Sequence, residues 1–199
     1  VNISSLPYSI ANQTTLCKGD DYNNASTGSC ASLYESGEDM VFSYTAASAQ
    51  CINITLSNTS SAQAGFLLYQ NCPGSASANC LGYVGGGNVA SNFTLPSAGT
   101  YYIVVDSWSP PGFVTFNLNV TAGSGASPND YPCSATSLPL GVTLGGDNRC
   151  SNGLLEPAVP SCWTVGVVNT VWYAVTPTGT SLNIRTILGT LTNTQIALY

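Results

Sequence analysis

The second half of the chain repeats the beginning of the first half, and this internal repeat limits the possible folds more than any other feature. DMVFSYT, for example, resembles TVWYAVT. The matching segments are 4–17 with 136–150, 39–45 with 170–176, 52–56 with 182–186, and 65–69 with 195–199. The offset stays between 130 and 133 residues, which indicates two copies of one structural module.

The two copies differ in length. We predict a first module at residues 1–121, a short Gly- and Ser-rich linker at 122–128, and a second module at 129–199. The first copy continues well beyond Tyr69, whereas nothing corresponding to that continuation follows Tyr199. The second module is therefore expected to be incomplete.

An incomplete module would leave strand edges and an apolar face exposed, which natural proteins pair or cover. Two explanations remain open, and they are compatible. The chain is part of a longer protein whose continuation completes the module. Alternatively, a neighbouring molecule supplies the missing strands, so that subunits self-associate head to tail into a fibre.

The composition indicates an all-β protein and excludes several classes of partner. Of 199 residues only three are basic, nine are acidic and none is histidine, which leaves nothing to neutralise nucleic-acid phosphates. No apolar run approaches the ~18 residues that a membrane-spanning helix needs. We therefore expect neither nucleic-acid binding nor a membrane span. No signal peptide is recognisable, so the chain is expected to be a mature form.

Short segments that alternate apolar and polar residues, or are fully apolar, follow one another at regular intervals with turn residues between them. These are MVFSYTA, CINITLS, AGFLLYQ, SNFTL, YYIVVDSW and FVTFNLNV in the first copy, and NTVWYAVT and SLNIRTIL in the second. No long stretch has helical periodicity. The pattern predicts an all-β fold of tandem jelly-roll-like or Ig-like antiparallel β-sandwiches, the second of them incomplete.

Eight cysteines favour disulfides over zinc, because the chain has neither CxxC pairs nor histidine. Disulfides in turn predict an extracellular or cell-surface location. The repeat aligns Cys17 and Cys30 with Cys150 and Cys162, which predicts the pairs Cys17–Cys30 and Cys150–Cys162. A further pair, Cys72–Cys80, would close a third loop. The partners of Cys51 and Cys133 stay open; for Cys51 the alternative is a buried free thiol.

Three segments resemble a known family. GDDYNNASTGSCASLYESGEDMVFSYTA, GFLLYQNCPG and GTYYIVVDSWSPPG are similar to the bacterial pre-peptidase C-terminal domain, a jelly-roll-like sandwich related to the collagen-binding modules of collagenases. The second copy, which opens with NDYPCSATSLPL, resembles a variant of the same module that occurs in tandem in secreted and surface proteins. The resemblance implies a non-catalytic accessory or surface module.

Acidic residues gather in two loops of the first copy, Asp20 with Asp21 and Glu38 with Asp39. Calcium takes six to eight oxygen ligands, and some members of the family bind it near such a turn. A calcium site at these four residues is one reading, with no other cofactor expected. The alternative is that the carboxylates accept backbone hydrogen bonds in turns.

Trp108 lies in DSWSPPG, a tight loop beside aromatic strands. An exposed Trp stacks on sugar rings or proline-rich ligands, whereas a buried one would cap the end of the sandwich; both remain open.

The first copy also holds seven Asn-x-Ser/Thr sequons, which accept N-linked glycans in secreted proteins. Glycans would hydrate a surface with few charges, but Asn- and Thr-rich strands also produce sequons by composition alone. The acceptor residues are Asn2, Asn12, Asn24, Asn53, Asn58, Asn92 and Asn119.

No catalytic constellation is recognisable, because histidine and the Gly-x-Ser-x-Gly nucleophile motif are both absent from the sequence. The sequence thus predicts a structural or adhesive extracellular protein, a subunit of a surface fibre built from sandwich modules. The alternative is an accessory module of a secreted hydrolase that binds carbohydrate or a collagen-like ligand through Trp108 and the acidic loops.

Overall fold

The computed structural model describes residues 1–123, 127–148, 150–151, 157, 160, 169–189 and 194–199. The chain divides into two compact units, Val1–Gly125 and Ala126–Tyr199, which are described separately below. No helix among the described residues has the length and apolar character required to cross a membrane.

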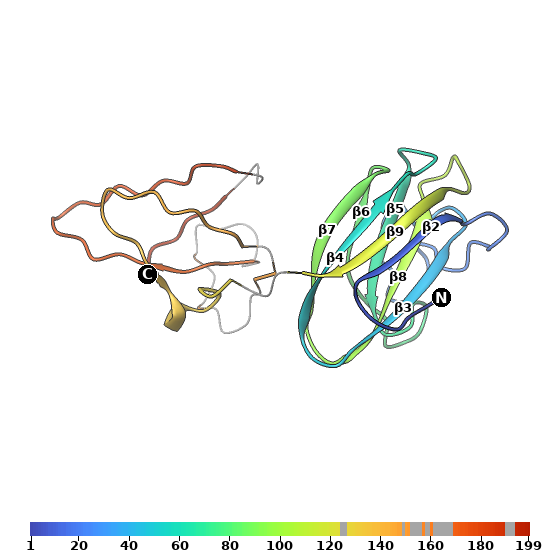
Figure 1. The fold of residues 1–199 in the computed structure, drawn as a ribbon, viewed down its shortest axis with the longest axis horizontal. Coiled ribbons are helices and arrows are strands. Elements are labelled where there is room, and N and C mark those ends of the chain that lie inside the picture. Colours follow the sequence, from blue (N-terminus) through green and yellow to red (C-terminus); the bar gives the residue numbers. More distant parts are fainter. Residues whose placement is uncertain (124–126, 149, 152–156, 158–159, 161–168, 190–193) are drawn as a thin grey trace. The chain divides into compact units, whose positions relative to one another are not determined.

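The first unit contains nine strands in two sheets (Figure 1). One sheet has the order β1-β3-β8-β5-β6 and the other the order β2-β9-β4-β7. The strands are β1 (Asn2–Ile3), β2 (Tyr8–Thr14), β3 (Met40–Ala46), β4 (Gln50–Ser57), β5 (Ala64–Gln70), β6 (Asn79–Gly85), β7 (Val89–Leu95), β8 (Gly99–Ser107) and β9 (Thr115–Ala122).

Most strand neighbours within a sheet come from distant parts of the sequence. β3 pairs with β8, β5 with β8, and β2 with β9, all antiparallel, and only β5 and β6 form a hairpin within one sheet. Successive strands otherwise alternate between the sheets, which is the winding of a jelly roll. The predicted all-β, jelly-roll-like sandwich is thus confirmed for the first unit.

The core lies between the inner faces of the two sheets, because each strand presents every second side chain inward. β4 shows this period clearly: Ile52, Ile54 and Leu56 are buried, while the residues between them are partly exposed. Phe42 contacts Phe116 of the opposite sheet edge to face, with ring centroids 6.2 Å apart. This dry, interlocked core gives the loops of the unit a rigid support.

Three strands of the first unit were missed by sequence reasoning: β1, which has only two residues, and the irregular strands β2 and β6. β2 changes register between Ile10 and Gln13, where Asn12 has a positive φ of 55°. β6 pairs with β5 through another register shift and contains Gly82 with a φ of 147°. A bulge breaks the alternation on which a strand prediction depends, so these edge strands gave only a weak signal.

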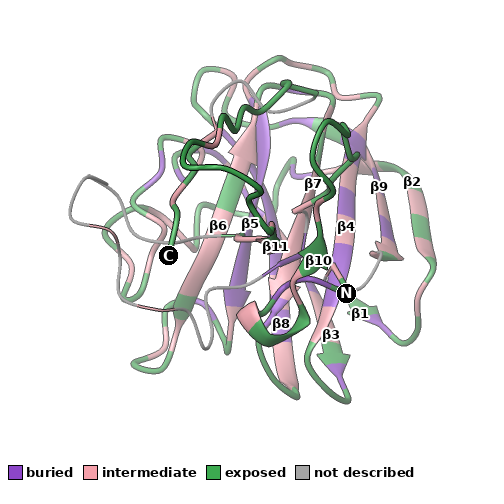
Figure 2. Cartoon of the chain, turned by 90° about the vertical axis from the view of Figure 1, so that its left-hand side faces the viewer, coloured by how far each residue is buried: buried purple, intermediate pink, exposed green. Residues whose placement is uncertain are grey.

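The second unit has little regular structure among its described residues. A short 3-10 turn, η1 (Pro132–Ser134), precedes β10 (Thr136–Ser137), which pairs in parallel with β11 (Tyr173–Ala174). The strand predicted at 169–176 thus shrinks to two residues, and the one predicted at 181–188 is absent from the described structure. Much of this described trace is exposed (Figure 2).

Candidate functional site

Residues 16–39, which connect β2 to β3, cover the outer face of the five-stranded sheet; we call them the covering segment. They contact that face at three places. Cys30 is bonded to Cys80 of β6, Glu35 accepts a hydrogen bond from Tyr69 of β5, and Gly37 donates one to Asp106 of β8. The apolar side chains of Leu67, Tyr69 and Val104 are buried on this outer face as a second, smaller core.

Three carboxylates are buried between the covering segment and the sheet: Glu35, Asp39 and Asp106 are only 1%, 4% and 0% exposed. Each accepts two hydrogen bonds from backbone N–H groups. Glu35, for example, accepts from Cys30 at 3.1 Å and from Ser32 at 2.8 Å. A buried carboxylate is tolerated only when its oxygens find such partners, so these three side chains fix the path of the segment.

Asp106 is the most confined of the three. Its Oδ1 accepts the N–H of Gly37 at 3.1 Å and that of Ser107 at 2.5 Å, while its buried Oδ2 has no hydrogen-bond partner among the described residues. Burial raises the pKa of Asp106 to about 8, and the charge of nearby Asp39 adds to the rise. The sequence alone could not show that Asp106 is buried.

Asp39 holds the start of the covering segment. Its Oδ2 accepts the N–H groups of Asp21 at 2.8 Å and Tyr22 at 2.9 Å, and its own N–H donates to the carbonyl of Gly19 at 2.8 Å. Burial raises the pKa of Asp39, and the two accepted hydrogen bonds oppose that rise. On β5, burial and the hydrogen bond to Glu35 raise the pKa of the Tyr69 hydroxyl.

The four residues suggested for calcium do not converge. Asp20 and Asp21 are exposed, Oε2 of Glu38 accepts the backbone N–H of Lys18 at 3.2 Å, and Asp39 bonds to the backbone as described. Within the described parts of the chain, no three His, Cys, Asp or Glu side chains gather closely enough to hold a metal ion. This arrangement does not fit the six to eight oxygens that calcium takes, and the calcium site stays a prediction.

Trp108 lies just after β8 with 43% of its surface exposed. Its indole ring meets the ring of Tyr34 at 71°, with the centroids 6.5 Å apart. Its backbone is held from two sides, because its N–H donates to the carbonyl of Gln63 at 2.9 Å and the next N–H, of Ser109, donates to Ser36 Oγ at 3.1 Å. Trp108 therefore leans on Tyr34 yet still presents ring surface to solvent.

Tyr34 and Tyr83 extend this aromatic surface and were not found from the sequence. The ring of Tyr34 lies over Gly65 and Gly85, which face each other on β5 and β6. Tyr83 lies two residues before Gly85 on β6, and 48% of its surface is exposed. The signal in the sequence is a pair of glycines, Gly65 and Gly85. It could not be recognised from the sequence, because the two residues become neighbours only when β5 and β6 pair.

The disulfides differ from the predicted pairs. Cys30 bonds to Cys80, with 5.2 Å between their Cα atoms, and Cys17 and Cys72 are free and exposed. The predicted pairs Cys17–Cys30 and Cys72–Cys80 are therefore wrong. The covering segment runs across the sheet between Cys17 and Cys30, and its middle part, at Gly28, lies against Ala78 in the loop before β6.

The other cysteines divide as follows. Cys51 is disulfide-bonded, so it is not the buried free thiol considered as one alternative. Cys150 is disulfide-bonded as well, while its predicted partner Cys162 lies outside the described residues. Cys133 is free and exposed.

The seven sequon asparagines fall into two groups. Asn2, Asn12, Asn24 and Asn58 are exposed. By contrast, Asn53 and Asn92 face each other on β4 and β7 with a 3.2 Å hydrogen bond between their amides, and Asn119 donates to Ser9 Oγ at 2.5 Å. The side-chain amides of this second group are thus hydrogen-bonded to side chains of neighbouring strands.

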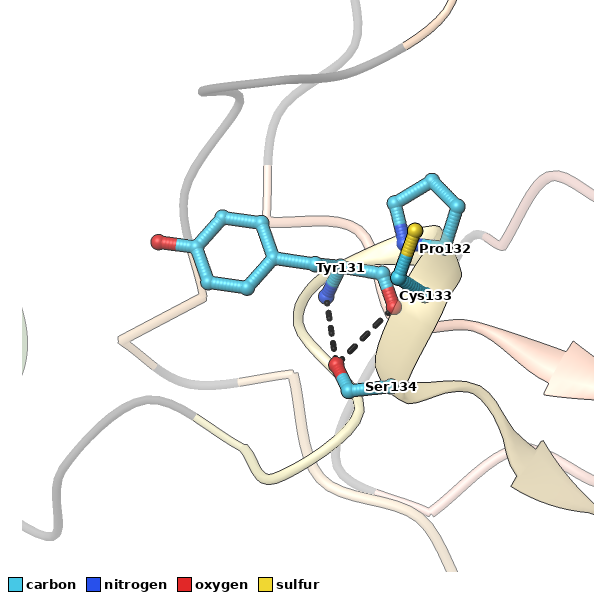
Figure 3. Close-up of a pocket in the computed structure, with 4 residues that line it drawn as sticks. All are labelled: Tyr131, Pro132, Cys133 and Ser134. Carbon is cyan, nitrogen blue, oxygen red and sulfur yellow. Dashed lines mark hydrogen bonds between the residues drawn. The ribbon is translucent and has the colours of Figure 1, made fainter.

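Figure 3 shows a shallow pocket in the described part of the second unit. It is lined by the three residues of η1 and by Tyr131, which precedes them. The Ser134 hydroxyl accepts the N–H of Tyr131 at 3.4 Å and donates to its carbonyl at 3.0 Å. These polar groups satisfy one another, so the pocket is the surface of a single turn and offers no set of converging ligand groups.

Part of the first unit matches a known family of domains. Residues 38–107, from the end of the covering segment through β8, match the model of the bacterial pre-peptidase C-terminal domain. Over these residues the first unit resembles a pre-peptidase C-terminal domain. The match includes Asp39, Asp106 and Tyr83, and it excludes most of the covering segment.

Solved structures similar to this chain have TM-scores below 0.5. The pre-peptidase C-terminal domain of a Bacillus anthracis collagenase is 21% identical over 60% of this chain and 92% of that one, with a TM-score of 0.41. A periplasmic lysozyme inhibitor, PliG of Aeromonas hydrophila, is 15% identical over 61% and 96%, with a TM-score of 0.40.

A CBM36-1 domain of a xylanase from a termite hindgut metagenome, that of Trinervitermes trinervoides, is 14% identical over 47% of this chain and 77% of that one, with a TM-score of 0.29. Scores this low transfer neither a ligand nor an activity. No curated protein matches the chain.

Proposed function

We propose that the protein is a non-catalytic, extracellular binding module that attaches to an extended polymer, carbohydrate or collagen-like, through the aromatic surface at Trp108. The observation that carries this proposal is the 43% exposure of a Trp whose ring and backbone are both held in place. Exposed, immobilised aromatic rings bind with little loss of conformational entropy. The pre-peptidase C-terminal-like fold of the unit supports an accessory role.

The absence of histidine and of a nucleophile motif from the sequence supports a role in binding rather than catalysis. The buried carboxylates also support this view, because Glu35, Asp39 and Asp106 accept hydrogen bonds from their own backbone. These three carboxyl groups hold the covering segment and are not free to act on a substrate.

A sedimentation assay with insoluble polymers tests the proposal. The full chain is mixed with cellulose, chitin, insoluble xylan or fibrillar collagen, and bound protein is measured after centrifugation. We expect Trp108→Ala to lower binding about tenfold, the loss of a single stacked ring. Tyr131→Ala is the matched control, because it removes an aromatic ring that is 36% exposed in the other unit. Equal binding by both variants and the native chain would refute the proposal.

A second candidate function is a fibre subunit, in which strands of one molecule complete the second unit of the next. One observation favours it: several apolar side chains of that unit are exposed, among them Ile187 at 66% and Leu198 at 75%. Strand addition would bury them and pair their backbone. Sedimentation velocity over a range of concentrations tests this candidate. Growth of long polymers supports it, and a constant monomer removes it.

A further inference from the structure

Three aromatic rings lie on the outer face of the five-stranded sheet. Phe66 of β5 and Val84 of β6 belong to the inner core, so their neighbours Gly65 and Gly85 point outward. Tyr34 lies on that outer side, because its ring is what a Cβ at Gly65 or Gly85 would meet. Tyr83 is two residues before Gly85 on the same strand and therefore faces the same way.

The rings follow one another in the order Trp108, Tyr34, Tyr83. The first two have centroids 6.5 Å apart. Gly85, which supports the hydroxyl end of Tyr34, and Tyr83 are two strand positions apart, roughly 6.6 Å along β6. All three side chains are at least partly exposed. The surface is thus a row of rings that runs from the end of β8 over β5 to the edge strand β6, and we call it the aromatic row.

The paired glycines set the height of the middle ring. A Cβ at Gly85 would lie 1.9 Å from Cζ of Tyr34, and one at Gly65 would lie 2.7 Å from its Cδ1. Glycine in a strand weakens it and commonly marks the close approach of another group. Here the group is Tyr34, which rests directly on the backbone of β5 and β6. Gly65 and Gly85 are therefore positioning residues for the row.

The chemistry around the row favours an uncharged, hydroxyl-rich ligand. Lys18 is the only Lys or Arg in residues 1–123, so an anionic polymer would find almost no counter-charge. Two of the three rings carry hydroxyls, which both donate and accept hydrogen bonds, as sugar hydroxyls do. The apolar faces of sugar rings stack on aromatic side chains, and a linear sugar polymer presents such faces repeatedly.

We propose that Trp108, Tyr34 and Tyr83 together bind one chain of a neutral polysaccharide, with the Gly65–Gly85 pair holding Tyr34 close against the sheet. This inference rests on the proposed binding function and names its ligand class and its further contact residues. A collagen-like peptide, which also stacks on aromatic side chains, is the competing ligand, and the test below separates the two.

Affinity electrophoresis of the full chain provides the test, with hydroxyethylcellulose, galactomannan and soluble xylan as neutral probes, alginate as the anionic probe and gelatin as the peptide probe. We expect retardation by at least one neutral probe and none by alginate or gelatin. Tyr83→Ala and Tyr34→Ala should each weaken binding about tenfold.

Gly85→Ala tests the positioning role, since it keeps every ring but displaces Tyr34, and we expect a similar tenfold loss. Gly112→Ala is the matched control, because a Cβ there meets no atom within 4 Å. Near-ultraviolet circular dichroism and melting temperature establish that each variant is folded. If Gly85→Ala fails to fold, the Tyr34→Ala and Tyr83→Ala results decide the matter.

The outcomes separate this inference from the proposed function. If Trp108→Ala has no effect on any polymer, the proposed function fails and the inference fails with it. If Trp108→Ala weakens binding while Tyr34→Ala and Tyr83→Ala do not, only the row is overturned. Retardation by gelatin or alginate alone would overturn the ligand class.

Discussion

The carboxylate of Asp106 on β8 accepts a 3.1 Å hydrogen bond from the backbone N–H of Gly37, which ties the covering segment to the sheet. Burial raises the pKa of Asp106 to about 8 in the folded protein, whereas an unfolded Asp titrates near ~3.9. The folded state therefore holds this proton more tightly than the unfolded state does. The stabilisation that this creates is complete below pH ~4 and is lost as the pH rises toward 8.

Asp106→Asn should remove this pH dependence, because an amide keeps the accepting oxygen and does not ionise. We expect the native chain to lose up to ~1.4 kcal/mol of unfolding free energy per pH unit relative to the variant between pH 5 and pH 8. Urea unfolding at several pH values measures this difference. Parallel stability curves for the two proteins would show that Asp106 ionises normally.

Glu35→Gln should destabilise the first unit, because one carboxylate oxygen of Glu35 is replaced by an NH2 group, which cannot accept a hydrogen bond. Either the N–H of Cys30 and the Tyr69 hydroxyl or the N–H of Ser32 then loses its acceptor. Leaving a buried donor without a partner costs about 1–3 kcal/mol. Thermal melting at constant pH tests this. Glu38→Gln is the control, since Glu38 accepts one weaker bond from Lys18 at 3.2 Å, and a similar loss in both variants would contradict the prediction.

The Cys30–Cys80 disulfide closes a loop of 50 residues. Replacing both cysteines by alanine should cost about 3–4 kcal/mol on the chain-entropy account and should expose the covering segment to proteases. Limited proteolysis followed by mass spectrometry would detect cleavage within residues 16–39. Cys17→Ser serves as control and should cleave no faster than the native chain, since Cys17 is free and exposed. Peptide mapping that linked Cys30 to Cys17 would contradict the pairing.

Sequon occupancy should follow the exposure of the asparagine. On expression in a glycosylating eukaryotic host, we expect glycans at Asn24 and Asn58, which lie outside the strands, and none at Asn53 or Asn92. The last two face each other across β4 and β7, where directly opposite Cβ atoms are only about 5 Å apart, too close for two glycans. Glycopeptide mass spectrometry reads this directly, and occupied Asn53 and Asn92 would refute it.

Sequence reasoning found the regular strands because their signal is local. β3, β4, β5 and β8 alternate or are apolar throughout, as strands in a sandwich do, and each pattern is contained in seven to nine consecutive residues. It missed β2 and β6, where bulges interrupt the alternation. In the second unit it predicted strands at 169–176 and 181–188, although a strand pattern forms a strand only when a partner is present to complete its hydrogen bonds.

By itself, the sequence determined the fold class, the repeat and the presence of disulfides, because composition and period-two patterning are properties of neighbouring residues. The tertiary structure alone decided that Cys30 meets Cys80, that Asp106 is buried beneath Gly37, and that Tyr34 lies across Gly65 and Gly85. Each of these contacts joins residues about 30 to 70 positions apart, brought together by a connecting segment without regular structure. Its path is set by buried hydrogen bonds and close packing, and neither leaves a periodic trace in the chain.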